Sequence, residues 1–333
     1  MVRLFAAQVE VSPLSEAKHD PMRHSHRFAL LPAALICGLI AAASPADATT
    51  EARPRSVAAV APTTAPFQSS RILVETKGQG PDVVLIPGLA STSAVWARTA
   101  AALEGRYRVH LVTVRGFGET APGGNAEGLV GAPTAAEIRR YIEEQGLQRP
   151  ALIGHSMGGQ VALRVAADAG DRVGKVMVVD ASPFFPSLIS PGSTAADVEP
   201  LARIAYQGLM LLGDQALRTQ AASMGLELGG AADNVLGGLG WQGGDRRVLA
   251  QGLYEVMVTD LRSRLPLIEA PVTVVYGWSP DDSSPRSHID GLFRAGYRSL
   301  PRPATFERIE GAEHMVMIDR PKQFQQAVER FLR

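Results

Sequence analysis

A serine lies at the centre of a group of small residues in the segment ALIGHSMGGQVAL, residues 151–163. Gly154, Ser156 and Gly158 fit the pattern GxSxG; apolar residues typical of a buried strand precede it, and residues typical of a helix follow it. Such a turn strains the serine backbone, and flanking glycines let strand and helix approach without a clash. The pattern predicts a nucleophilic Ser156 that projects from the turn, and a tight structural turn is the alternative interpretation.

The elements that must position this serine are visible as an alternation of short apolar runs and longer amphipathic stretches. Near-continuous Val, Leu and Ile marks strands that are buried on both faces, and therefore a mostly parallel sheet with helices on either side. The sequence predicts an α/β fold with Ser156 at the carboxyl edge of this central sheet. The predicted strands are residues 82–88, 107–114, 150–156, 173–182, 271–277 and 304–311.

One segment interrupts the alternation, at about residues 183–266. It holds helix-like patches around a glycine-rich stretch and shows no strand pattern. Since it falls between two predicted strands, we expect a helical cap insertion over the carboxyl edge, where open α/β sheets bind ligands.

The N-terminal region, residues 1–48, has the organisation of an export signal. From Met22, the expected start, two arginines precede an apolar run at 28–43, and the small-x-small triplet Ala-Asp-Ala ends at Ala48. The apolar run is shorter than the ~20 residues that span a bilayer. We expect a signal peptide cut near Ala48 and a periplasmic or extracellular product with no stable membrane span; an uncleaved anchor is the alternative. A linker (49–68) and one domain (69–333) follow.

Composition excludes several classes of function. The 33 basic and 33 acidic residues balance, so no global field favours nucleic acid or an anionic membrane surface, and we expect a small-molecule partner. The single cysteine, Cys37, lies in the signal region, so the exported chain would have no disulfide, thiol nucleophile or cysteine-based metal site. No HExxH motif occurs, so neither a metal nor another cofactor is implied. The oligomeric state is left open.

Four segments carry a resemblance to a known family: LIPGLASTSAVW, VRGFGET, GHSMGGQVAL and GAEHMVMIDRP. In their order and spacing, from about Ile72 to Arg333, the sequence resembles the α/β-hydrolase superfamily, in which a serine in a nucleophile elbow works with a histidine and a carboxylate.

This resemblance implies that His314, in the loop after the last predicted strand, is the general base. A serine hydroxyl attacks poorly unless a base with a pKa near neutrality takes its proton. Of the other histidines, His155 is expected to pack and hydrogen-bond beside the nucleophile, and His110 to be structural. His288 is an alternative base.

Two backbone N–H groups are expected to form an oxyanion hole. Met157 supplies one at the start of the helix after Ser156, and Leu89, in the turn after the first long strand, supplies the other.

The third member of the triad is open among three aspartates. In the superfamily the acid usually lies in the loop after the strand VTVVYG, so Asp281 is favoured and Asp282 ranks third. Asp180, at the end of the preceding strand, ranks second, with the alternative role of capping the turn before Ser182 and Pro183.

The sequence thus predicts a carboxylesterase-like serine hydrolase that cleaves carboxylic esters or lactones of small apolar compounds through an acyl-enzyme. C–C bond hydrolysis, cofactor-free perhydrolysis and acyl transfer are alternatives on the same fold. A non-catalytic binding protein is the alternative from another class.

Overall fold

The computed structural model describes residues 66–223, 242–280 and 284–333, with the backbone alone for 212–223. The predicted signal peptide and nearly all of the predicted linker lie outside the described residues. So do Asp281 and Asp282.

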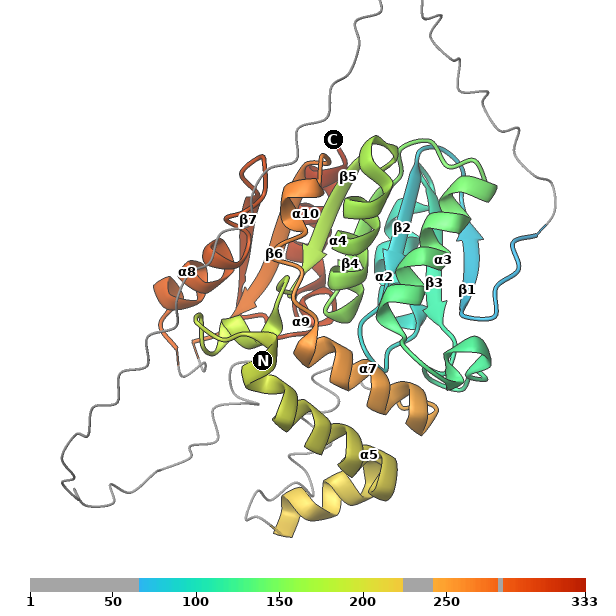
Figure 1. Ribbon diagram of the computed structural model, residues 1–333. Helices are drawn as coiled ribbons and strands as arrows, with labels where there is room; N and C mark the ends of the chain where they lie inside the picture. Colours follow the sequence, from blue (N-terminus) through green and yellow to red (C-terminus); the bar gives the residue numbers. More distant parts are fainter. Residues whose placement is uncertain (1–65, 224–241, 281–283) are drawn as a thin grey trace, which may run out of the picture. The chain divides into compact units, whose positions relative to one another are not determined.

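Seven strands form one sheet in the order β1-β3-β2-β4-β5-β6-β7 (Figure 1). β1 is antiparallel to β3, and every other pair of neighbours is parallel. All six predicted strands are present, and the predicted mostly parallel sheet is confirmed. The strands are β1 (Ile72–Lys77), β2 (Asp82–Ile86), β3 (Arg108–Val114), β4 (Ala151–His155), β5 (Lys175–Val179), β6 (Val272–Trp278) and β7 (Thr305–Glu310).

The sequence analysis did not predict β1. Ile72 is its only buried residue, and the strand pairs on one side alone, at the edge of the sheet. An exposed edge strand does not need the continuous apolar composition that identifies the central strands, and ILVETK lacks it.

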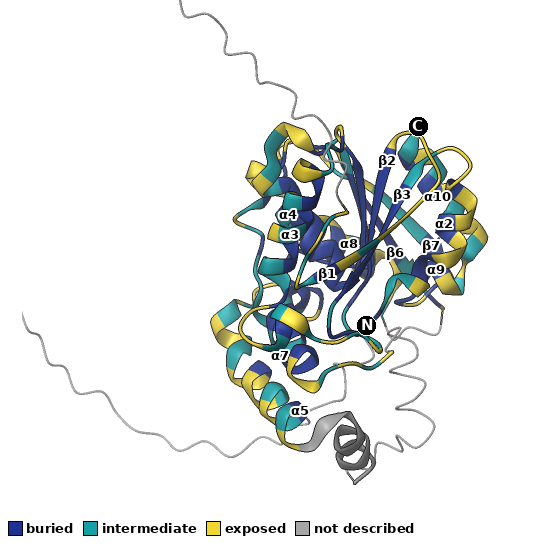
Figure 2. Ribbon diagram, turned by 90° about the vertical axis from the view of Figure 1, so that its right-hand side faces the viewer, coloured by how far each residue is buried: buried dark blue, intermediate teal, exposed yellow. Residues whose placement is uncertain are grey.

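Helices cover both faces of the sheet, as predicted (Figure 2). On one face α3, α4 and α8 pack into a large apolar cluster, and on the other α2, α9 and α10 pack into a second one. These helices are α2 (Ala97–Leu103), α3 (Gly131–Glu144), α4 (Met157–Ala169), α8 (Arg286–Gly296), α9 (Val316–Asp319) and α10 (Pro321–Leu332). Short 3-10 turns are η1 (Ser93–Trp96), η2 (Gly123–Ala126) and η3 (Gly170–Arg172).

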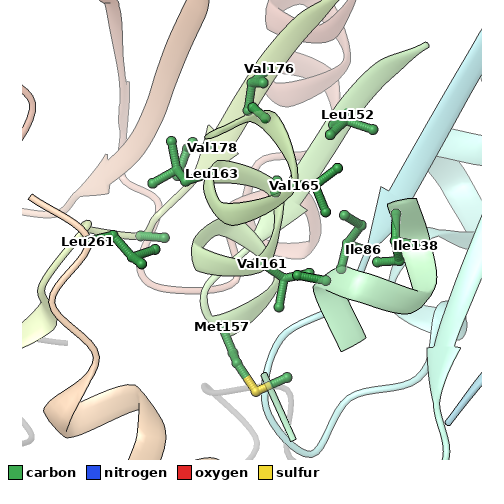
Figure 3. Close-up of a cluster of buried hydrophobic side chains, with 14 of the residues drawn as sticks. Ile86, Ile138, Leu152, Met157, Val161, Leu163, Val165, Val176, Val178 and Leu261 are labelled. Atoms are coloured by element: carbon green, nitrogen blue, oxygen red, sulfur yellow. The ribbon is translucent and has the colours of Figure 1, made fainter. Parts of the chain in front are cut away.

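Helix α4 is the element that the sequence places directly after Ser156. Its Val161 and Val165 are buried beside Ile86 and Leu152 of the sheet and Ile138 of α3 (Figure 3). Burying each such aliphatic side chain stabilises the fold by ~1.5–3 kcal/mol. The start of α4 is therefore held firmly against the sheet.

Between β5 and β6 the described chain is helical, with η4 (Phe185–Leu188), α5 (Ala195–Ser223), α7 (Arg246–Val258) and η5 (Leu265–Leu267). Helices α5 and α7 pack against each other beyond the carboxyl ends of the central strands (Figure 1). Asp245 caps α7 by accepting a hydrogen bond from the amide of Arg247.

A buried carboxylate fixes α7 to the rest of the domain. Glu255 accepts hydrogen bonds from the amides of Val130 (2.6 Å) and Gly131 (2.9 Å), where α3 begins. The first amides of a helix have no partner within it and carry partial positive charge, so a carboxylate is well placed there. No helix in the described ranges is long and apolar enough to cross a membrane.

Candidate active site

Ser156 occupies a strained turn between β4 and α4. Its φ of 53° and ψ of −121° lie where residues other than glycine are rare, a conformation that costs ~1–3 kcal/mol unless the surroundings enforce it. The surroundings do so here: the Ser156 amide donates to the carbonyl of Val179 (2.9 Å), and the Ser156 carbonyl accepts from Gly159 (2.8 Å). The hydroxyl is thereby carried at the carboxyl edge of the sheet.

The glycines of GxSxG are required by close backbone contacts. A Cβ atom on Gly154 would lie 2.2 Å from the carbonyl oxygen of Gly158, and one on Gly158 would lie 2.4 Å from the carbonyl oxygens of Ile86 and Pro87. Any side chain at these positions would force strand and helix apart. The two glycines thus allow the close approach that the GxSxG pattern predicts.

His314 lies in the loop after β7 and is paired with Asp180. Its Nδ1 is 2.6 Å from Asp180 Oδ2, and both residues are more than nine-tenths buried. Burial raises the pKa of Asp180, whereas the hydrogen bond and the charge of His314 lower it, and the pKa lies below its usual range. Asp180 is therefore an anionic acceptor that fixes one ring nitrogen of His314 and leaves Nε2 as the nitrogen that can take a proton.

The backbone around Asp180 explains this placement. Asp180 directly follows β5 and has a φ of 44°, a left-handed conformation, while its amide donates to the carbonyl of Val275 (2.7 Å). Its Oδ1 accepts from the amide of Gly277 (3.3 Å). A Cβ on Gly277 would lie 2.4 Å from the carbonyl oxygen of Glu313, so this glycine lets the histidine loop pack onto β6.

Of the three candidate aspartates, only Asp180 lies within the described residues. The carboxylate bonded to His314 is that of Asp180, which ranked second, and Asp281 and Asp282 lie outside the described residues. The described contacts of the Asp180 side chain do not include a cap of the turn before Ser182 and Pro183. Its oxygens contact His314 and Gly277, while Ser182 Oγ donates to the carbonyl of Phe184.

The other described histidines, His110, His155 and His288, lie in three different surroundings. His110 is buried, with Nε2 2.9 Å from Asp82 Oδ1 and Nδ1 2.6 Å from the Tyr141 hydroxyl. Asp82 begins β2 and therefore stands at the amino edge of the sheet. His288 lies in the first turn of α8 and is exposed. His155 is fully buried beside His314, with ring centroids 4.6 Å apart.

The two predicted oxyanion donors belong to segments that lie next to Ser156. Met157 is the first residue of α4, so its amide has no partner within the helix. A Cβ on Gly88 would lie 3.1 Å from Ser156 Cβ, so the turn that carries Leu89 packs closely against the serine. The Ser156 hydroxyl makes no hydrogen bond to a described residue, and the residue is 6% exposed.

The family model described as "Alpha/beta hydrolase family" matches residues 83–327. This chain belongs to the α/β hydrolase family. Among relatives of this hydrolase is a pimeloyl-[acyl-carrier protein] methyl ester esterase of Aeromonas hydrophila, 31% identical over 268 residues, covering 78% of this chain and 99% of the relative. The enzyme of the same name from Nitrosomonas europaea is 28% identical, covering 76% of this chain and 96% of its own.

Solved structures resemble the hydrolase in fold. The enol-lactonase from Burkholderia xenovorans LB400 has a TM-score of 0.59 and 19% identity, covering 78% of this chain and 96% of that one. A thermophilic esterase from Thermogutta terrifontis has a TM-score of 0.59 and 21% identity, covering 78% of this chain and 92% of that one.

Sequence reasoning missed one contact near the site of this hydrolase. The backbone N–H of Gln242, just before α7, donates to the carbonyl of Ala90 (2.7 Å). The side-chain Oε1 of Gln242 accepts from the backbone N–H (2.8 Å) and the hydroxyl (2.7 Å) of Thr92. The helical insertion is thus bonded to the turn that carries Leu89. No local pattern gives this contact, because 150 residues separate Gln242 from Thr92.

The described residues of the hydrolase include no group of three or more His, Cys, Asp or Glu side chains that could hold a metal ion. At the carboxyl edge of the sheet, Ser156 follows β4, and Asp180, which follows β5, is hydrogen-bonded to His314.

Proposed function

We propose that this chain is a serine hydrolase that cleaves carboxylic esters or lactones of small apolar compounds. The observation that carries the proposal is the buried pair of His314 and Asp180, with Nδ1 and Oδ2 2.6 Å apart, at the same sheet edge as a serine of positive φ. A histidine oriented by a carboxylate beside a projecting serine is the arrangement that activates a hydroxyl for attack.

In the proposed reaction Ser156 Oγ attacks the carbonyl carbon while His314 Nε2 takes its proton. Asp180 holds the Nδ1–H and stabilises the imidazolium that forms. The amides of Leu89 and Met157 donate to the oxygen that gains negative charge. His314 then gives the proton to the departing alcohol, and a water molecule activated by the same imidazole releases the acid from Ser156.

The relatives support an ester as the bond that is cleaved, since those named above are methyl ester esterases. Residues 183–266 contain eight acidic and six basic residues, and this excess of negative charge favours a free, uncharged ester over one that is attached to an acidic carrier protein. Arg203 pairs with Glu199, Arg247 with Asp245 and Arg262 with Asp260, so each of these cations is offset by an anion on its own segment.

We also propose that the protein is exported and that cleavage near Ala48 produces its mature form. The order of basic, apolar and small residues before that position supports this.

The function is tested with the purified full chain on p-nitrophenyl esters of graded acyl length and on lactones. We expect turnover, with the highest kcat/KM for short or medium acyl chains, and none in Ser156→Ala. Turnover of carrier-bound methyl esters alone would replace the proposed substrate class. Undiminished ester hydrolysis by a folded Ser156→Ala variant would exclude the serine mechanism.

A further inference from the structure

His155, the residue before the nucleophile, makes a contact that the proposed mechanism does not use. It ends β4, is fully buried, and its Nε2 lies 2.9 Å from the backbone carbonyl oxygen of His314. A carbonyl oxygen only accepts, so Nε2 carries the ring proton and donates it. The hydrogen bond thus runs from the strand that carries Ser156 to the main chain of the proposed base.

The other ring nitrogen of His155 has no such partner. Nδ1 is buried and has no hydrogen bond to any described residue. A Cβ on Gly88 would lie 2.9 Å from it, so the glycine of the oxyanion turn closes this side of the ring. A second proton, on Nδ1, would make the ring positively charged, and no described residue accepts a hydrogen bond from that nitrogen.

Electrostatics keep His155 in this one form. Burial, followed by the charge of neighbouring His314, lowers the pKa of His155 to about 3. When His314 takes the proton from Ser156, His155 therefore stays neutral and does not compete for it. The two imidazoles differ in role although they are adjacent in space.

We infer that His155 is a positioning residue for the proposed reaction: its Nε2–H holds the main chain of His314 so that the imidazole stays between Asp180 and Ser156. The inference rests on the proposed function. The rest of the histidine loop is tied elsewhere, through the amide of Glu313 to Asp319 Oδ2 (2.9 Å) and that of Gly311 to the carbonyl of Trp278 (2.7 Å). Of these three hydrogen bonds to the main chain of the histidine loop, only the one from His155 is made to residue 314 itself.

The test compares His155→Leu, which removes the donor, with His155→Gln, whose side-chain amide can donate from nearly the same place. A misplacement of ~1 Å at a reacting group costs ~10²-fold in rate. We expect kcat of His155→Leu to fall by ~10–10²-fold with KM nearly unchanged, and His155→Gln to recover most of that loss. Thermal melting and circular dichroism establish that each variant is folded.

Two kinetic outcomes would overturn the inference. One is full turnover by folded His155→Leu; the other is a His155→Gln variant that is as slow as His155→Leu, because the donor would then not be what matters. If Ser156→Ala retained turnover, the proposed function would fail whatever the His155 variants did. An inactive Ser156→Ala beside a fully active His155→Leu would reject the present inference alone.

A measurement on the unmodified protein keeps the test independent of how the variants fold. In the nitrogen-15 spectrum of the histidine rings, we expect His155 to have a protonated Nε2 and an unprotonated Nδ1 between about pH 5 and pH 8, the range in which an ordinary histidine titrates. A proton on Nδ1 at neutral pH, or titration of His155 within that range, would contradict the proposed role.

Discussion

Replacing Asp180 by asparagine should remove most of the activity while leaving the fold intact. The amide has nearly the same shape as the carboxylate but lacks the charge that faces His314 Nδ1 at 2.6 Å. At that separation and an effective dielectric constant of ~20, the charge is worth ~6 kcal/mol to the imidazolium. Because 1.36 kcal/mol is tenfold in rate, this corresponds to a loss in kcat on the order of 10⁴, the size seen when the acid of a well-studied triad is neutralised.

The assay is steady-state hydrolysis of a p-nitrophenyl ester, with circular dichroism as the check on folding. Asp281→Asn is the matched control, because it removes the same charge from the aspartate that the sequence favours, and we expect it to retain nearly full kcat. Near-normal turnover by Asp180→Asn would refute the reasoning from geometry. A large loss in Asp281→Asn alone would return the role of the acid to that residue.

Three other predictions concern parts of the molecule away from the triad. Gln242→Ala removes both side-chain hydrogen bonds to Thr92, so kcat for ester hydrolysis should fall by ~3–10-fold. An unchanged kcat would show that the turn that carries Leu89 keeps its conformation without these hydrogen bonds. Burial would raise the pKa of Asp82, but bonds from His110 and Arg108 outweigh it and lower the pKa to about 2. The ionised carboxylate therefore stabilises the fold above about pH 4, and this stabilisation is lost as the pH falls towards 2. Asp82→Asn should cost ~1–2 kcal/mol at pH 7, measured by urea unfolding, and nothing at the acid end; an equal cost at both ends would contradict this. Expressed from its own signal, the mature protein should begin near Thr49, and N-terminal sequencing that found residues 22–40 intact in a cytoplasmic pool would argue against export.

The fold could be predicted because its central strands are recognisable from their apolar sequences alone. β2, β4 and β5 are buried on both faces, so their sequences are almost wholly apolar over five residues each. The nucleophile turn is equally local, since the contacts of Gly154 and Gly158 that demand glycine are made within a few residues and with one neighbouring strand. β1 is different: an exposed edge strand buries only Ile72 and leaves no such pattern.

The carboxylate partner of His314 and the supporting contacts depend on which loops meet in space. Asp180 and His314 are 134 residues apart in the chain, and whether Asp180 turns towards the histidine loop depends on its backbone conformation, with φ at 44°. Its sequence context, an aspartate at a strand end, fits a turn cap equally well. His155 poses the same difficulty, because its partner is a backbone carbonyl 159 residues away.

The most direct test of a covalent mechanism at Ser156 is to locate the adduct of a fluorophosphonate probe, which mimics an ester and remains on an activated serine. The full chain is treated with the probe, digested, and mapped by mass spectrometry, with Ser156→Ala treated in parallel. We predict one equivalent of adduct on the peptide that contains Ser156, loss of ester hydrolysis in proportion to labelling, and no labelling of Ser156→Ala. Labelling of another residue that abolishes hydrolysis, or hydrolysis that continues after Ser156 is fully labelled, would contradict the account.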